Sequence, residues 1–370
     1  MPNTWELHLE RWTAAGVVDT SVRDRILTWE RENTEPQGLR WPVWIALAFG
    51  AILLGAGILL FVSAHWDQMS PAWRMTLLVA MIALLHAGGA VASSRLQGLS
   101  ITLHTLGTIS LGAAIALAGQ IFNLSEHWPS AVLLWALGAA AAWALLGHWT
   151  QATLTAILLP YWLVGEWWTL ADAHSRSFYP ISVGVCALSF AYLSARRGPD
   201  DSSFRKALGW LGGIALVPAV FAIGVEGPLA STAWSSDGTL AWAIAILIPL
   251  AVAVVLRGRE ALWAGVGIGW AVLMAAINAA GGGHLAIYFW SAIGATGLAL
   301  WGTDDSRPER INLGVIGFAL TVLFFYFSDV MDKFDRATGL IAGGLLFLAG
   351  GWLLERTRRG LMTHIRQEAI

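Results

Sequence analysis

Long apolar runs separated by short polar breaks dominate the sequence. Twelve runs reach about 18 residues or more, the length at which a helix spans the hydrocarbon core of a bilayer. They are residues 43–64, 72–92, 99–122, 130–147, 152–171, 178–195, 207–225, 239–256, 261–278, 284–301, 310–328 and 337–354. Because backbone polar groups in lipid must be paired within the protein, such runs predict helices. The pattern therefore predicts an all-α, polytopic transmembrane bundle of about 12 spans.

The first 42 residues have a different pattern, in which apolar side chains recur at helical spacing among charged ones. The two apolar stripes are Trp5, Leu9 and Trp12, followed by Val22, Ile26 and Trp29. Gly16 ends the first stripe, and Asp19 or Thr20 is placed to cap a second helix. This segment carries 5 basic and 7 acidic residues, which disfavours nucleic acid as a partner. We expect a short helical hairpin that packs on the cytoplasmic side of the bundle or on a protein partner.

Composition supports the membrane interpretation. Hydrophobic residues make up 56% of the chain and charged residues 12%, and the mean hydropathy is +0.62. A soluble domain carries about 25% charged residues, so too few polar side chains remain to cover a soluble fold of this size. The single cysteine, Cys186, excludes a disulfide framework or a cysteine-rich metal site. The chain is therefore expected to contact the lipid bilayer over most of its length.

The distribution of basic residues predicts an orientation. With twelve spans, 18 of the 22 Lys and Arg residues fall on the side that holds both termini. By the positive-inside rule, that side is the cytoplasm. The expected organisation is a cytoplasmic hairpin (1–42), a transmembrane bundle (43–354) and a basic cytoplasmic tail (355–370). Six spans in each half, 43–195 and 207–354, leave open a 6+6 repeat.

Polar groups inside the spans are few. His86 and His104 lie near the cytoplasmic ends of consecutive spans, with His148 on the same side. A metal site needs three or four ligands in one place, and no acidic residue lies at that depth to complete the set. Motifs for nucleotide binding, zinc proteases and serine hydrolases are missing from the sequence. We therefore expect no metal site, no cofactor and no catalytic residues.

Polar side chains gather instead at the predicted outer ends of several spans. Because polar groups are costly in lipid, such a cluster predicts a ligand site. The candidate ligand-binding residues are His65, Trp66, Asp67, Arg74, Gln120, Asn123, Trp128 and Glu166. Glu166 lies deepest, and it is expected to pair with Arg74 when the site is empty. The alternative interpretation is a belt of interfacial tryptophans with incidental charges.

With these residues in view, the chain resembles a bacterial membrane-protein family, the domain-of-unknown-function 2157 family, over roughly residues 4–150. The matching features are Leu9, Trp12, Gly16-Val17-Val18, Ile26 and Trp29 in the hairpin, then Trp66-Asp67, Arg74, Leu106-Gly107-Thr108, Gly112 and the run from Gly119 to Leu124. The resemblance implies a multi-pass protein of the bacterial inner membrane. It implies no reaction.

Three classes of function remain. A transporter, or a protein that handles a small polar solute or lipid through an outward-facing pocket, fits the many spans and the sparse polar groups. A structural or accessory scaffold that binds a partner through the hairpin is the alternative. An enzyme acting at the outer face, with groups such as His65 and Asp67 as acid and base, ranks third. A ligand between the spans favours the first class, and a dry, close-packed interior favours the second.

Overall fold

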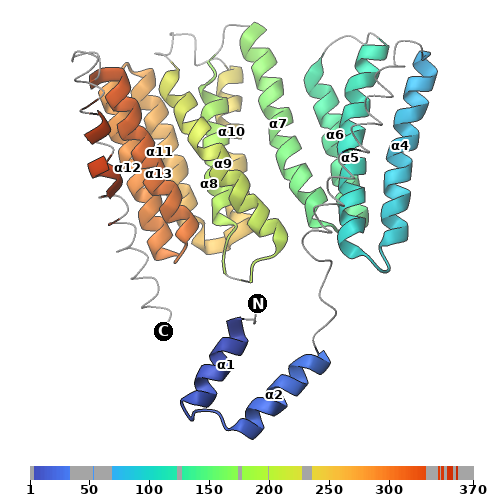
Figure 1. The fold of residues 1–370 in the computed structure, drawn as a ribbon. Helices are drawn as coiled ribbons and strands as arrows, with labels where there is room; N and C mark the ends of the chain where they lie inside the picture. The colour runs from blue at the N-terminus through green and yellow to red at the C-terminus, as the bar shows by residue number, and fades with distance from the viewer. Residues whose placement is uncertain are drawn as a thin grey trace. The chain divides into compact units, whose positions relative to one another are not determined.

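The computed structural model describes residues 4–33, 53, 69–122, 127–173, 177–198, 200–226, 236–330 and, beyond these, 341, 343–345, 348–352 and 356. Within this part of the chain the fold is all-α, with twelve α-helices (Figure 1). The contacts divide the protein into two compact units, Met1–Arg74 and Met75–Ile370.

The N-terminal unit contains the predicted pair of amphipathic helices. α1 (Thr4–Ala14) and α2 (Thr20–Asn33) contact each other across a short turn. Gly16 ends the first helix with a φ of +70°, a conformation that glycine adopts without steric cost. Asp19 lies at the N-cap position of the second helix, since its carbonyl accepts hydrogen bonds from the Val22 and Arg23 amides and its Oδ1 accepts one from the Thr20 amide at 2.8 Å. The structure thus confirms the two helices and the cap.

Ten further helices follow in the order that the apolar runs predict. They are α4 (Pro71–Ala92), α5 (Gln97–Ile121), α6 (Trp128–Leu146), α7 (Trp149–Ala173), α8 (Tyr179–Ser194), α9 (Ser203–Val225), α10 (Ser236–Arg257), α11 (Leu262–Ala279), α12 (Gly283–Asp304) and α13 (Pro308–Phe325). Each coincides with one predicted span to within a few residues. The first predicted span, 43–64, and most of the last, 337–354, lie outside the described residues.

Seven stretches of the described chain are long and apolar enough to cross a membrane. One of them, Gly238–Ala279, covers most of α10 and all of α11. The two helices are counted together because only the short 3₁₀ turn η2 (Gly258–Ala261) lies between them. α8, with 16 residues, is apolar but shorter than the others. The protein is therefore a polytopic helical membrane protein, and the count of twelve spans stays a prediction.

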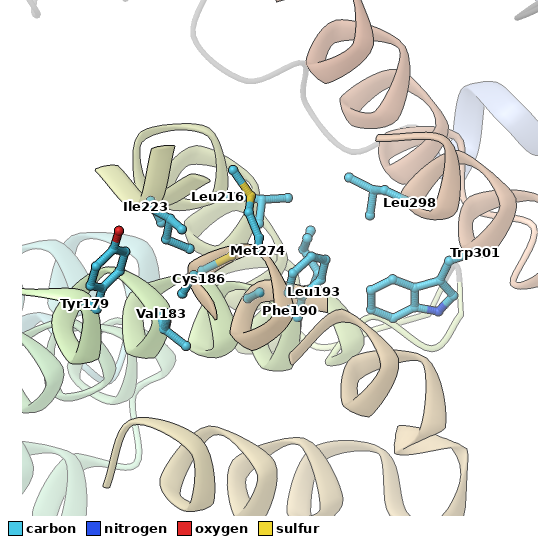
Figure 2. Packing of buried hydrophobic residues seen from close by; sticks show 13 residues of the cluster. Tyr179, Val183, Cys186, Phe190, Leu193, Leu216, Ile223, Met274, Leu298 and Trp301 are labelled. Atoms are coloured by element: carbon cyan, nitrogen blue, oxygen red, sulfur yellow. The ribbon is translucent and has the colours of Figure 1, made fainter. Parts of the chain in front are cut away.

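α8 lies at the centre of the second unit and is the most buried helix of the described chain. It contacts α9, α10 and α11, while α12 packs closely on α13. Figure 2 shows the largest apolar cluster, in which Val183, Cys186 and Phe190 of α8 meet Leu216 and Met274. The cluster reaches Leu298 and Trp301 of α12 at its far side.

Neighbouring helices form antiparallel hairpins, which brings three turns to the same end of the unit. Gly184 and Ala191 of α8 lie beside Ala245 and Ala253 of α10, whereas Phe190 lies over Gly267 of α11. α10 therefore runs parallel to α8, and α11 returns antiparallel to α10. The α8–α9, α10–α11 and α12–α13 turns are joined there by arginine side chains.

Candidate functional site

The predicted outer site includes Glu166, which lies near the C-terminal end of α7. Its Oε2 lies 2.9 Å from Nε2 of His127, and its Oε1 accepts a hydrogen bond of 2.9 Å from the Trp162 indole. His127 immediately precedes α6, so this pair connects the ends of two neighbouring helices. The side chains of His127 and Glu166 are 53% and 31% exposed. An accessible carboxylate and imidazole can bind a polar or cationic group.

Trp128 lies beside this pair. Its ring centroid is 5.7 Å from that of Tyr161, and its indole covers Gly165. A Cβ at Gly165 would come within 2.6 Å of the indole ring, so the missing side chain lets Trp128 approach the backbone next to Glu166. The structure thus brings together two of the predicted site residues, Glu166 and Trp128.

The other predicted site residues are not brought to this pair by the described contacts. Gln120 is exposed in the last turn of α5. The Arg74 Nε donates to the Met69 carbonyl at 3.1 Å, and both residues belong to the N-terminal unit. Asn123, His65, Trp66 and Asp67 lie outside the described residues. The full pocket and the Arg74–Glu166 pair stay predictions.

A cavity of about 440 Å³ lies among α8, α9, α11, α12 and α13. Pockets that hold small molecules measure about 300–1,000 Å³, so the cavity is large enough for a ligand. Its walls include Phe190, Leu216, Met274 and Leu298, which Figure 2 shows projecting from four different helices. Most of the lining is aliphatic or aromatic, which suits an apolar occupant.

The cavity is elongated along the helix axes. On α12 the lining extends from His284 to Leu298, a rise of about 21 Å at 1.5 Å per residue. On the antiparallel α13 it extends from Leu313 to Ser328, which lies within the following π-helical turn, η3 (Tyr326–Val330). A long, narrow space of this kind matches an extended chain better than a compact solute.

Polar groups lie mainly at one end of the cavity. His284, Tyr288 and Ser328 line that end, where α12 begins and α13 has just ended. Nδ1 of His284 lies 4.0 Å from Oδ1 of Asp329. In the middle, the Thr321 hydroxyl is already bonded to the Gly317 carbonyl of its own helix. An occupant would therefore find hydrogen-bonding side chains at one end and apolar walls elsewhere.

Sequence reasoning did not find this cavity. Its polar members, His284, Tyr288 and Ser291, recur at i, i+4 and i+7 and so share one face of α12. This polar stripe is the one feature of the sequence that could have indicated the cavity. The rest of the lining has the aliphatic and aromatic character of any lipid-facing or core position, so the sequence does not distinguish a cavity wall from packed interior.

Three histidines lie close together, as the sequence predicted: His86 on α4, His104 on α5 and His148 just before α7. The Nδ1 atoms of His86 and His104 are 2.9 Å apart, and the His148 ring lies 5.5 Å from that of His104. Each ring of the close pair covers a glycine of the other helix, His86 on Gly107 and His104 on Gly89. Among the residues that the structure describes, no group of three or more His, Cys, Asp or Glu side chains is arranged to hold a metal ion.

Comparisons with known proteins agree with this architecture. No curated protein and no solved structure matches the chain. One family model does, over residues 10–150, which run from α1 into the first turn of α7. This segment of the chain is therefore similar to the family described as predicted membrane protein (DUF2157).

Proposed function

We propose that the protein binds a lipid-like amphiphile in the cavity among α8, α9, α11, α12 and α13, as a step in its transport or handling. The observation that carries the proposal is the cavity itself. Protein interiors are packed to about the density of organic crystals, with few voids larger than a water molecule. A space of about 440 Å³ among five helices is far larger than such voids, and because it is partly open to the surroundings of the bundle, a ligand can enter it.

Shape and polarity indicate the class of ligand. The lining extends along about 21 Å of α12, which suits an extended hydrocarbon chain. The polar residues His284, Tyr288 and Ser328 at one end would contact a hydroxyl, carboxylate or headgroup. Burying one methylene contributes about 0.8 kcal/mol, so a chain of moderate length binds without any charged contact.

The pocket at the predicted outer face is a second candidate, for a small polar solute. It is supported by the His127–Glu166 pair and by the indole of Trp128 beside it. The sequence-based hypothesis that Gln120, Asn123, Arg74 and the segment His65-Trp66-Asp67 also contribute to the site stays a prediction. Glu166→Gln would then weaken binding of the solute while the protein still folds, and Gln120→Leu would do the same.

We further propose that the protein lies in the bacterial inner membrane with both termini in the cytoplasm. The charge distribution supports this orientation, with 18 of 22 basic residues on one side of a twelve-span chain. The hairpin of α1 and α2 would then face the cytoplasm. Trp12, Val22 and Trp29 are 47%, 41% and 62% exposed, which suits contact with a protein partner. That surface is the main support for the alternative, a scaffold.

A photoreactive fatty acid tests the lipid-like ligand. The purified protein is irradiated with a diazirine-bearing single-chain lipid, and the labelled residues are mapped by mass spectrometry. Labels are expected on the lining residues of α12 and α13, such as Tyr288 and Thr321. Labels confined to side chains outside the lining would contradict the proposal.

A pair of matched variants sharpens the test. Leu320→Trp places a large ring in the cavity, because Leu320 is part of the lining. Ile316→Trp places the same ring on the same helix at a side chain that is 50% exposed and outside the lining. The first variant should lose most of the labelling and the second should retain it. Equal labelling of the Leu320→Trp and Ile316→Trp variants would contradict a ligand in the cavity and favour the scaffold function.

A further inference from the structure

Arginine side chains fill the end of the second unit where three hairpin turns meet. Six of them come from the α8–α9 turn, the end of α10 and the α12–α13 turn: Arg196, Arg197, Arg205, Arg257, Arg307 and Arg310. The carboxylates that pair with these six arginines are four in number: Asp201, Glu260, Asp305 and Glu309. Positive charge is therefore in excess inside the cluster.

Each of these carboxylates already pairs with at least one arginine other than Arg307, and the exposed Glu260 lies 3.0 Å from Arg257. Asp201 accepts hydrogen bonds from the Arg196 side chain and the Arg197 amide, at 3.0 and 2.9 Å. Asp305 pairs with Arg257 at 3.0 Å and also with Arg310. Glu309 lies 3.4 Å from Arg196.

Backbone carbonyls accept hydrogen bonds from several of these arginines. Arg205 donates to the carbonyls of Ala195 and Leu256 at 2.8 and 3.1 Å, and Arg197 donates to the same Leu256 carbonyl. Arg310 reaches the Leu193 carbonyl at 2.8 Å and stacks on Trp301, with Cζ 4.0 Å from the ring centroid. These contacts satisfy hydrogen bonds but cancel no charge.

Arg307 differs from the others. It is 7% exposed, yet its side chain makes no hydrogen bond to any residue that the structure describes, and its Nε is buried without a partner. The Nε of Arg310, which interacts electrostatically with Arg307, is also buried and unpartnered among the described residues. The buried Nε–H of Arg307 is costly, because it has lost its water without gaining an acceptor. The Asp201 carboxylate attracts Arg307 electrostatically but accepts no hydrogen bond from its side chain.

We propose that this cluster binds a phosphate group, with Arg307 as its principal contact. A guanidinium binds phosphate through two parallel hydrogen bonds, which would satisfy the Arg307 side chain and offset the excess charge. Two sources supply such a group, the headgroup of an anionic phospholipid and free inorganic phosphate. The hairpin turns lie at the end of the apolar helices, where phospholipid phosphates are found.

Lipid titration of the full-length protein tests the proposal. Delipidated protein in a neutral detergent is mixed with phosphatidylglycerol or with phosphatidylcholine, and lipid adducts are counted by native mass spectrometry. Wild-type protein should bind phosphatidylglycerol, and Arg307→Gln should weaken this binding by about tenfold or more. Arg259→Gln changes an exposed arginine of the neighbouring turn and should alter the binding by less than about twofold.

Inorganic phosphate distinguishes the source. The thermal unfolding temperature of the delipidated wild-type protein is measured in phosphate and in chloride at equal ionic strength. An increase in phosphate, lost in Arg307→Gln, shows that the free ion is sufficient, whereas an increase with phosphatidylglycerol alone assigns the lipid. If Arg307→Gln fails to fold, Arg307→Lys keeps the charge but not the two-pronged contact and should still weaken binding. Wild-type protein that responds to neither probe, or variants that bind as wild type does, would overturn the proposal.

Discussion

Single residues determine how closely the helices of this protein approach. Gly89 and Gly107 show the effect most clearly, because each lies under a histidine ring of the other helix. The two Nδ1 atoms can come within 2.9 Å only where neither helix carries a side chain at these positions. Gly112 and Gly294 have similar roles under the rings of Trp135 and Trp270.

Gly107→Ala should therefore destabilise the contact between α4 and α5. The added Cβ would lie 2.8 Å from Nε2 of His86, and overpacking of this kind costs about 1–3 kcal/mol. Gly98→Ala is the matched control, because it lies in the same helix and a Cβ there meets nothing within 4 Å. Thermal unfolding in detergent should separate the two. Equal unfolding temperatures would mean that the histidine ring moves aside at little cost.

A buried amide gives a second prediction at this scale. Gln151 on α7 is 0% exposed, and neither its Oε1 nor its Nε2 has a hydrogen-bond partner among the described residues. Gln151→Met keeps the approximate volume and removes both polar atoms, so it should raise the free energy of unfolding by about 1–3 kcal/mol. A denaturant titration measures the change. A loss of stability would show that the amide is satisfied in the folded protein.

At the scale of elements, the sequence predicted the helices well and their contacts poorly. The ten described helices from α4 to α13 follow the apolar runs, because length and hydrophobicity alone require a helix in lipid. Their partners do not follow, since a helix that is apolar all round has no face that identifies its neighbour. Glu166 and Trp128 could be predicted as site residues because a carboxylate and an interfacial indole stand out among apolar residues. The cavity lining could not be predicted, because its side chains resemble those of any apolar helix.

Glu226 connects two elements and gives a prediction for pH. It follows α9, and its Oε1 accepts from the Ser177 hydroxyl at 3.0 Å and the Phe178 amide at 2.6 Å, at the start of α8. Burial raises the pKa of this carboxyl, and the hydrogen bonds from Ser177 and Phe178 only partly oppose the increase. Because the folded pKa is above the unfolded one, this group stabilises the fold at low pH and the stabilisation is lost as pH rises through the raised pKa.

Glu226→Gln should remove that dependence. The amide keeps an acceptor oxygen for Ser177 and Phe178 but does not ionise, so stability should change less between about pH 4 and pH 7 than in the wild type. Unfolding temperatures across this range provide the measurement. Parallel pH profiles for the two proteins would show that Glu226 does not titrate in the range.

For the whole molecule, orientation is the main prediction. Cys186 is the only cysteine and is fully buried, so an introduced cysteine can be labelled selectively. Cysteine at Ser70 should react with an impermeant maleimide in spheroplasts with an intact inner membrane, because that segment is predicted to lie outside. Cysteine at the exposed Asp200 should react only after the membrane is permeabilised. The reverse pattern would invert the assignment of the two faces.

The hydrogen bond between Arg310 and the Leu193 carbonyl limits the order in which the fold can form during synthesis. Arg310 contacts Leu193, which is 117 residues earlier, so synthesis of the intervening polypeptide precedes this contact. At about 5–20 residues per second, a ribosome needs roughly 6–23 seconds to cover that distance. During this interval α8 must remain next to its partners without the last arginine. A nascent protein stopped before α13 is therefore expected to expose the end of α8 to membrane proteases, and one extended through α13 is not.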